Sequence, residues 1–167
     1  MPVLRTIPHL FLVAALLVAA LLIGLAGAAA RADDGKVVYK SESSFEDTAF
    51  ALESAIVDRG LVIDYQSFIG NMLARTGADV GSDKAIFGDA QIFVFCSAVL
   101  SRKMMEADPA NVALCPWGVF VYDLPGEPEA SYVGYRTLVD AQTSQEDARR
   151  EIQALLDDIV REAADVE

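Results

Sequence analysis

The feature that most constrains the fold is a pair of strand-like runs, "GVFVYD" and "ASYVGYR", at residues 118–123 and 130–136. Both are rich in the β-branched and aromatic residues that favour strands. Pro125, Gly126 and Pro128 between them are typical of a turn-rich loop. The sequence therefore predicts an antiparallel hairpin. Its connection is longer than a tight two-residue turn, so we expect the loop to project from the body of the protein.

Other segments predict further strands and helices. The additional strand-like runs lie at the start of residues 37–44 and at 61–65 and 91–96. The last of them, "QIFVFC", is apolar enough to be a buried central strand. A helix is predicted after the capping pair Ser44 and Asp47. Gly60 ends it, and shorter helical patterns occupy residues 67–77 and 98–107.

The C-terminal helix is the strongest helical prediction. Thr143 with Glu146, or Ser144 with Asp147, can supply its N-terminal cap. Its apolar residues fall on one stripe that needs a partner surface: Ile152, Leu155, Leu156, Ile159, Val160 and Ala163. The order of elements predicts an α+β fold, in which a mostly antiparallel sheet of about five strands carries helices packed on one face.

The N-terminal residues 1–32 predict an export signal rather than part of the fold. An uncharged run from Leu10 to Ile23 is followed by small residues and Ala30-Arg31-Ala32. Cleavage after Ala32 would leave one domain, residues 33–167, in the periplasm or outside the cell. The alternative is an uncleaved membrane anchor, because residues 8–30 are uncharged and long enough to span a bilayer of ~30 Å.

The charge of the chain constrains its partners. The whole sequence carries a net charge of −12, and without Arg5 and Arg31 the mature part would carry −14. Nucleic acids and anionic lipid surfaces would be repelled, because affinity for them depends on Lys and Arg. A basic protein or a cation is the more natural charged partner, although acidity of this kind also simply keeps a domain soluble.

The only histidine of the chain is His9, which lies inside the predicted signal. The mature domain therefore has no histidine for a Ser-His-Asp or Cys-His nucleophile system, a His-ligated zinc ion or a His-bound haem. No phosphate-binding glycine motif is present either. The sequence shows no catalytic signature, so we expect a noncatalytic protein without a cofactor, copper being the alternative considered below.

The two cysteines, Cys96 and Cys115, predict a disulfide, because an even number of cysteines in an exported chain is usually paired. Cys96 ends one predicted strand and Cys115 precedes another. If these strands are antiparallel, the two residues meet at one end of the sheet. If they are parallel, roughly 15–20 Å separates them. The break at Asp108-Pro109 favours the antiparallel arrangement.

Thiol exchange or Cu(I) binding is the alternative interpretation of the same pair. Thiolates and thioethers are the ligands that Cu(I) prefers, so a copper site would use Cys96, Cys115 and Met105. Met104 and Met105 point in different directions on a helix, so both cannot easily serve one ion, and core packing is the expected role of one of them. Arg102 and Lys103 are the nearby cations that could activate a thiol.

Five residues are candidates for ligand binding: Asp64, Trp117, Asp123, Tyr132 and Tyr135. The two aspartates lie in or beside predicted strands, nearer the core than a helix-face carboxylate. Alternation along residues 130–136 places Tyr132 on one face of the sheet and Tyr135 on the other. One of these tyrosines is therefore expected to line an accessible surface.

Three segments together resemble a bacterial family, domain of unknown function 302: "SSFEDTAFALESAIVDRGLVI", "MMEADPANVALCPWGVFVYD" and "SYVGYR". The resemblance covers roughly residues 38–136 and implies a small α+β domain with a strand-helix-strands-helix plan. Met105, Asp108 and Pro109 match the family pattern. Where family members have a Gly-Asn-Pro turn after the central strand, this chain has Cys96-Ser97-Ala98, and the histidine often found in residues 67–77 is absent.

These observations favour an exported, noncatalytic domain that binds a small molecule or a partner protein. The second hypothesis is a periplasmic thiol-redox or Cu(I)-handling protein that uses Cys96 and Cys115.

Overall fold

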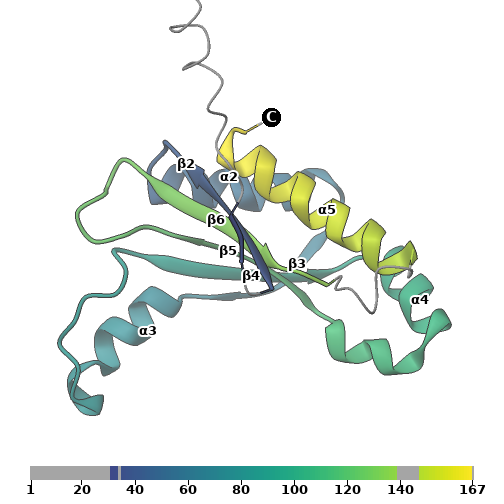
Figure 1. The fold of residues 1–167 in the computed structure, drawn as a ribbon, viewed down its shortest axis with the longest axis horizontal. Coiled ribbons are helices and arrows are strands. Elements are labelled where there is room, and N and C mark those ends of the chain that lie inside the picture. The colour runs from purple at the N-terminus through teal and green to yellow at the C-terminus, as the bar shows by residue number, and fades with distance from the viewer. Residues whose placement is uncertain (1–30, 34, 139–146, 167) are drawn as a thin grey trace, which may run out of the picture.

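A computed structural model describes residues 31–33, 35–138 and 147–166 of the chain. Its centre is a six-stranded sheet in which every neighbouring pair of strands is antiparallel (Figure 1). In spatial order the strands are β1 (Arg31–Asp33), β2 (Lys36–Ser41), β6 (Ser131–Arg136), β5 (Trp117–Tyr122), β4 (Ala90–Cys96) and β3 (Val62–Ser67). The predicted mostly antiparallel sheet is confirmed, and the three-residue β1 adds a sixth strand to the five expected.

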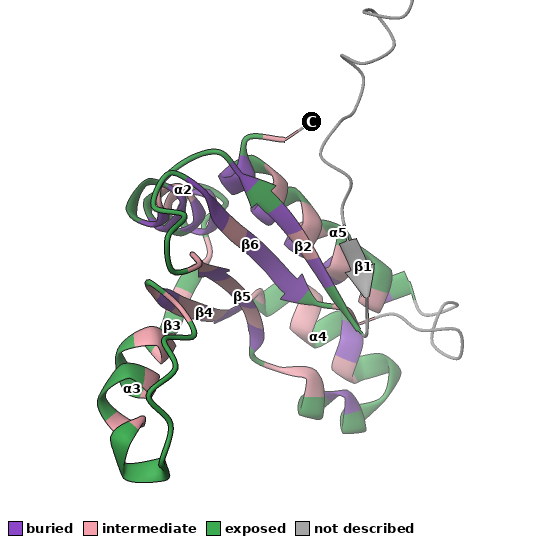
Figure 2. Cartoon of the chain, turned by 60° about the vertical axis from the view of Figure 1, so that its left-hand side comes forward, coloured by how far each residue is buried: buried purple, intermediate pink, exposed green. Residues whose placement is uncertain are grey.

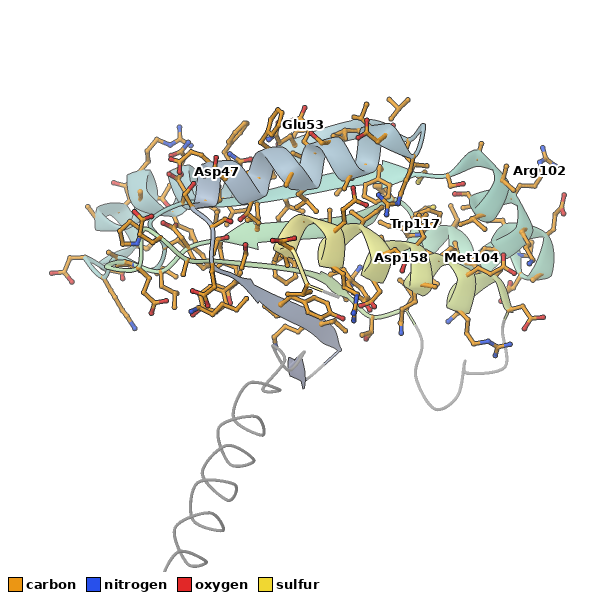
Figure 3. All side chains as sticks on the ribbon, turned by 90° about the horizontal axis from the view of Figure 1, so that it is seen from above. Asp47, Glu53, Arg102, Met104, Trp117 and Asp158 are labelled. Carbon is orange, nitrogen blue, oxygen red and sulfur yellow. The ribbon has the colours of Figure 1, made fainter. Side chains whose placement is uncertain are left out.

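Two long helices cover one face of this sheet. They are α2 (Phe45–Asp58) and α5 (Asp147–Ala164), which lie side by side in the view from above (Figure 3). The shorter helices flank the sheet at its two ends (Figure 1): α3 (Ile69–Thr76), followed by the 3-10 turn η1 (Ala78–Val80), and α4 (Ala98–Ala107), followed by η2 (Pro109–Leu114). The expected α+β class with helices on one face is therefore confirmed.

The core lies between the sheet and the two long helices. Alternate residues of the four central strands point into it, since successive side chains of a strand face opposite sides. From the helices the core receives Leu52 and Ile56 of α2 and, from the predicted apolar stripe of α5, Ile152, Leu156 and Ile159. The strand side chains in the core are Val37, Tyr39, Phe93, Phe95, Trp117, Val119, Val121, Val133 and Tyr135.

Local sequence signals explain where α2 begins and ends. The Asp47 N–H donates to Ser44 Oγ at 3.2 Å, and the Ser44 hydroxyl donates to the Asp47 carboxylate at 2.9 Å. This satisfies an amide that the first helical turn otherwise leaves unpaired. Gly60, with φ at +71°, follows the helix in the left-handed region that favours glycine. Both predicted boundary signals are confirmed.

Polar contacts tie the helices to the sheet. The Ser131 hydroxyl donates to Thr48 Oγ1 at 2.7 Å inside the core, and the Thr48 hydroxyl lies 3.4 Å from Ser41 Oγ. An ion pair of 2.8 Å between Arg59 and Glu162 joins the end of α2 to α5. Because buried hydroxyls need partners, this chain of three fixes α2 in position over β2 and β6.

Two sequence predictions concern residues that lie mostly outside the described ranges. The predicted cap of α5 at residues 143–147 lies outside them except for Asp147, the first residue of that helix. Of the predicted signal, only Arg31 and Ala32 are described, and both belong to β1. Within the described ranges, no helix combines the length and apolar character needed to cross a membrane.

Candidate functional site

The face of the sheet opposite α2 and α5, here called the open face, is the candidate site. Cross-strand pairing defines its members, because paired residues point to the same side. At one end of it lie the start of α3 and the segment before β4. The side chains that line it include Ile92 and Val94 of β4, Phe120 and Tyr122 of β5, and Tyr132 of β6.

Four aromatic rings form a row along the open face. Tyr122 stands in the middle, with its ring centroid 5.1 Å from that of Tyr132 and 6.2 Å from that of Phe120. These two pairs are nearly parallel, at 14° and 25°. Phe87, from the segment before β4, tilts against Tyr122 at 5.4 Å. All four side chains are half-buried, so their ring surfaces are partly available to a ligand.

A cavity of about 240 Å³ opens at this row. Its walls come from β4, β5, the start of α3 and the segment before β4: Ile69, Phe87, Ala90, Gln91, Ile92, Phe120, Val121 and Tyr122. None of these residues is charged. Gln91 and Val121 alternate with the open-face residues of their strands, so their side chains point to the core side, and the Tyr122 hydroxyl is the polar side-chain group of the lining. A pocket of this lining favours a neutral, apolar molecule, with few polar contacts to fix its orientation.

Two carboxylates lie beside the cavity: Asp89 directly precedes β4, and Asp123 directly follows β5. The Asp123 side chain accepts a hydrogen bond from the Asp89 main-chain N–H. The Asp123 N–H in turn donates to the Asp89 carbonyl at 3.1 Å. Burial, together with the negative charge of Asp123, raises the pKa of Asp89 above its ordinary value. Asp123, a candidate from the sequence, therefore helps to hold the segment that carries Phe87, and it gives this end of the site negative charge.

Tyr132 and Tyr135 fall on opposite faces, as alternation predicts. Tyr132 lies on the open face, where its hydroxyl donates to Glu127 at 3.1 Å. Tyr135 is buried beneath α5, and its hydroxyl donates to Asp157 Oδ1 at 3.1 Å. The Tyr39 hydroxyl donates to the same oxygen at 2.7 Å. Asp157 thus anchors α5 to β2 and β6, and Tyr135 belongs to the packing of the core rather than to the open face.

This tyrosine pair gives the fold a pH dependence. Burial and the proximity of Asp157 raise the pKa of both Tyr39 and Tyr135 above the ordinary value of 10.0. In the unfolded chain these phenols ionise near that ordinary value, so their contribution to stability is complete below about pH 10 and is lost as the pH rises through the folded values.

We therefore expect the free energy of unfolding, measured in urea, to fall between pH 9 and pH 11. The double substitution of Tyr39 and Tyr135 by Phe should flatten that decline. An equally steep decline in the double variant would contradict this assignment, and a Tyr65→Phe variant, altered at an exposed tyrosine of β3, is the control.

The structure places the other two candidates away from the cavity. Trp117 is a core residue, 2% exposed, and it packs edge-on against Phe95 with ring centroids 6.4 Å apart (Figure 3). Its indole N–H has no hydrogen-bond acceptor among the described residues. The expectation that Asp64 lies near the core is wrong, because its side chain is exposed. Asp64 lies where the register of β3 against β4 shifts between Ile63 and Tyr65. A bulge of this kind turns the extra residue out of the ladder.

The cysteines meet at the opposite end of β4 from the cavity walls. Because β4 and β5 are antiparallel, the end of β4 lies beside the start of β5, and the Sγ atoms of Cys96 and Cys115 are 3.1 Å apart. This confirms the geometric condition set by the sequence. The predicted disulfide itself is not formed, because both residues are free thiols. Burial, followed by the hydrogen bond to Cys115, raises the pKa of Cys96 to about 11.

Two parts of the thiol and copper hypothesis find no support in the geometry. Arg102 and Lys103 are paired with Glu106 and Glu151, and Arg102 points away from the body of the protein (Figure 3). The expectation that they activate a thiol is therefore corrected. In the described part of the chain no three His, Cys, Asp or Glu side chains gather as metal ligands. Of the two methionines, Met104 is the one that packs in the core, where it is fully buried, and Met105 is half-buried.

Comparison with known proteins identifies the fold. The family model described as "Domain of unknown function DUF302" matches residues 37–163. The chain belongs to the DUF302 family. A crystal structure of an uncharacterized conserved DUF302 protein from Bacillus stearothermophilus is similar, with a TM-score of 0.59 and 16% sequence identity. The match covers 80% of this chain and 98% of that one. A comparison with curated proteins finds no match.

Membership in the DUF302 family extends the resemblance found in the sequence. The matched region runs beyond the hairpin through most of α5, which supplies much of the core. At 16% identity the solved DUF302 structure shows the shared fold alone. The sequence did not predict that Ile69 and Phe87 line the cavity. It also did not predict that Asp157 accepts the hydrogen bonds of Tyr39 and Tyr135. No local motif marks them, because each acts through a partner distant in sequence.

Proposed function

We propose that this DUF302 protein is an exported domain that binds a small, flat, apolar molecule on the open face of its sheet and catalyses no reaction on it. The observation that carries the proposal is the row of half-buried rings, Phe87, Tyr122, Phe120 and Tyr132, beside a cavity with uncharged walls. Soluble domains usually cover such apolar surface, and an uncovered patch commonly marks a binding site.

The dimensions and charge of the site limit the ligand. A volume of about 240 Å³ lies just below the usual range of ligand pockets, roughly 300–1,000 Å³, so the ligand would be a small ring system. Stacking on the parallel rings of Tyr122 and Tyr132 favours a planar molecule. Asp89, Asp123 and Glu127 near the row disfavour anions, so the molecule would be neutral or carry a positive charge at its edge.

Export rests on the N-terminal sequence, with its apolar core and small-residue exit before Asp33. One experiment addresses export and binding together: native mass spectrometry of the protein from the periplasmic fraction of bacteria that express the full chain. We expect a chain that begins at Asp33 and carries a small organic molecule. An unprocessed chain would refute export, whereas a processed chain without ligand in native and solvent-extracted samples would count against binding.

A dye titration tests the position of the site. Nile red, a neutral planar dye, should gain fluorescence with the purified protein and bind at least roughly tenfold more weakly to Tyr122→Ser, since a removed aromatic contact of this kind is worth about 1–3 kcal/mol. Tyr65→Ser is the matched control, because Tyr65 is 64% exposed on the edge strand β3 and lies outside the cavity. Equal loss in both variants would place the dye elsewhere. Thermal unfolding would show that both variants remain folded.

A further inference from the structure

The pair of thiols at the junction of β4 and β5 is not explained by the proposed ligand site. Cys96 ends β4 and Cys115 directly precedes the cis-proline Pro116 and β5. Their Sγ atoms are 3.1 Å apart although 19 positions separate them in sequence. They are the only cysteines of the chain, so each is the other's sole intramolecular partner for oxidation.

The surroundings of the two sulfurs are unequal. The Cys96 thiol donates its hydrogen to Cys115 Sγ, and the Ser101 hydroxyl lies 3.4 Å from the same Cys115 sulfur. Two hydrogen-bond donors can therefore converge on the Cys115 sulfur. Burial, the largest cause, together with the neighbouring Cys115 and Asp64 raises the pKa of Cys96 to about 11, although a hydrogen bond from Ser101 acts in the opposite direction.

The segment between the cysteines is fixed to the body of the protein. Met104 of α4 is fully buried in the core. The Asn111 side chain, also buried, donates to the Met104 carbonyl at 2.9 Å and accepts a hydrogen bond from Arg149 of α5. These contacts hold η2 and α4 in place whether or not the sulfurs are joined. Closing the contact to a disulfide of about 2.05 Å would thus need a sulfur movement of only about 1 Å.

We infer that Cys96 and Cys115 form a redox-active dithiol that closes reversibly to a disulfide, with Cys115 as the sulfur that reacts first. The partner is a small-molecule disulfide such as glutathione disulfide. Both cysteines are half-buried rather than enclosed, so a small disulfide can reach the junction. The inference is independent of the proposed ligand site, which lies toward the other end of β4.

The reaction has two exchange steps. In the first, Cys115 Sγ attacks one sulfur of glutathione disulfide, the new S–S bond forms as the old one breaks, and one glutathione thiolate leaves. In the second, Cys96 gives its proton to solvent, and its sulfur attacks Cys115 Sγ and releases the second glutathione thiolate. The protein loses two electrons and two protons, and glutathione disulfide is reduced to two glutathione thiols.

The test follows these steps on the purified, reduced protein. Samples treated with glutathione disulfide are quenched with acid and alkylated, and the mass of the intact protein is then measured by mass spectrometry. We expect the native chain to lose the mass of two hydrogen atoms and both alkylation sites, and to recover them with dithiothreitol. The closed form should unfold roughly 5–10 °C higher than the reduced form, because the cross-link restricts the unfolded chain.

Single variants assign the order of attack. Cys96→Ser should accumulate one glutathione on Cys115, whereas Cys115→Ser should form an adduct more slowly, because burial, the largest cause of the raised pKa of Cys96, persists in that variant and reduces the thiolate fraction. A native chain that keeps two alkylatable thiols would overturn the inference. Faster reaction of Cys115→Ser than of Cys96→Ser would overturn the assigned order.

Discussion

Replacing Gly134 by alanine is expected to lower the free energy of unfolding by about 3 kcal/mol, at the upper end of the range for overpacking. Gly134 lies in the middle of β6, paired with Val38 on one side and Phe120 on the other. A Cβ atom there would stand 2.1 Å from the Val37 carbonyl oxygen and 2.8 Å from Phe120 Cζ. The ring can turn away, but the carbonyl oxygen is part of the β2 backbone, so the two strands would have to separate.

Gly118→Ala is the matched control for this prediction. Gly118 lies on β5 and the open face, and a Cβ atom there would make ordinary contacts with Ile92 at 3.6 Å and Val94 at 3.7 Å. We expect a change within about 0.5 kcal/mol. Urea unfolding followed by the fluorescence of Trp117, the single tryptophan, measures both variants. Equal stability of the two variants would show that β2 and β6 have more freedom than the structure indicates.

Replacing Asp157 by alanine is expected to cost about 2 kcal/mol of stability. The Asp157 side chain is the shared acceptor of the Tyr39 and Tyr135 hydroxyls, and both tyrosines are buried, at 5% and 2% exposure. Removal of a hydrogen-bond partner from a buried donor costs about 1–3 kcal/mol, and here two donors lose the same partner. Urea unfolding at pH 7 is the measurement.

Two variants isolate the cause of that loss. Asp157→Asn keeps an oxygen acceptor and should retain most of the stability. Asp158→Ala alters the neighbouring, exposed carboxylate of the same helix (Figure 3) and should change the free energy of unfolding by less than about 0.5 kcal/mol. If Asp157→Ala were as stable as Asp158→Ala, the paired hydroxyls would find water or other partners, and Asp157 would not anchor α5.

The sequence predicted those parts of the fold that local patterns encode. Apolar runs and turn residues located the strands of the sheet, and the stripe from Ile152 to Ala163 located α5, because amphipathic periodicity is a property of contiguous residues. The meeting of Cys96 with Cys115 also followed from the sequence, since it required only that β4 and β5 be antiparallel. Strand β1 was not expected, because three residues at a sheet edge carry no pattern of their own.

The candidate site was predicted only in part. Alternation along β6 placed Tyr132 on the open face, but its neighbours in the aromatic row come from β5 and from the segment before β4, and their register cannot be read from one strand. The sequence also did not predict how α3 packs against the rest of the protein. It has an apolar face that includes Met72, yet it buries no residue and is largely exposed (Figure 2), so its pattern wrongly suggests a core helix.

The bulge in β3 has a consequence for association between molecules. A sheet with an uncovered apolar face invites neighbouring chains, and its edge strands offer unpaired main-chain groups to them. Here the β3 edge is interrupted by the register shift that turns Asp64 into solvent. At the other edge, cleavage after Ala32 would remove most of β1 and leave β2 as the edge strand. The β3 edge therefore presents no long, flat ladder to a second sheet, and it resists the strand pairing that leads to aggregation although the open face carries apolar side chains.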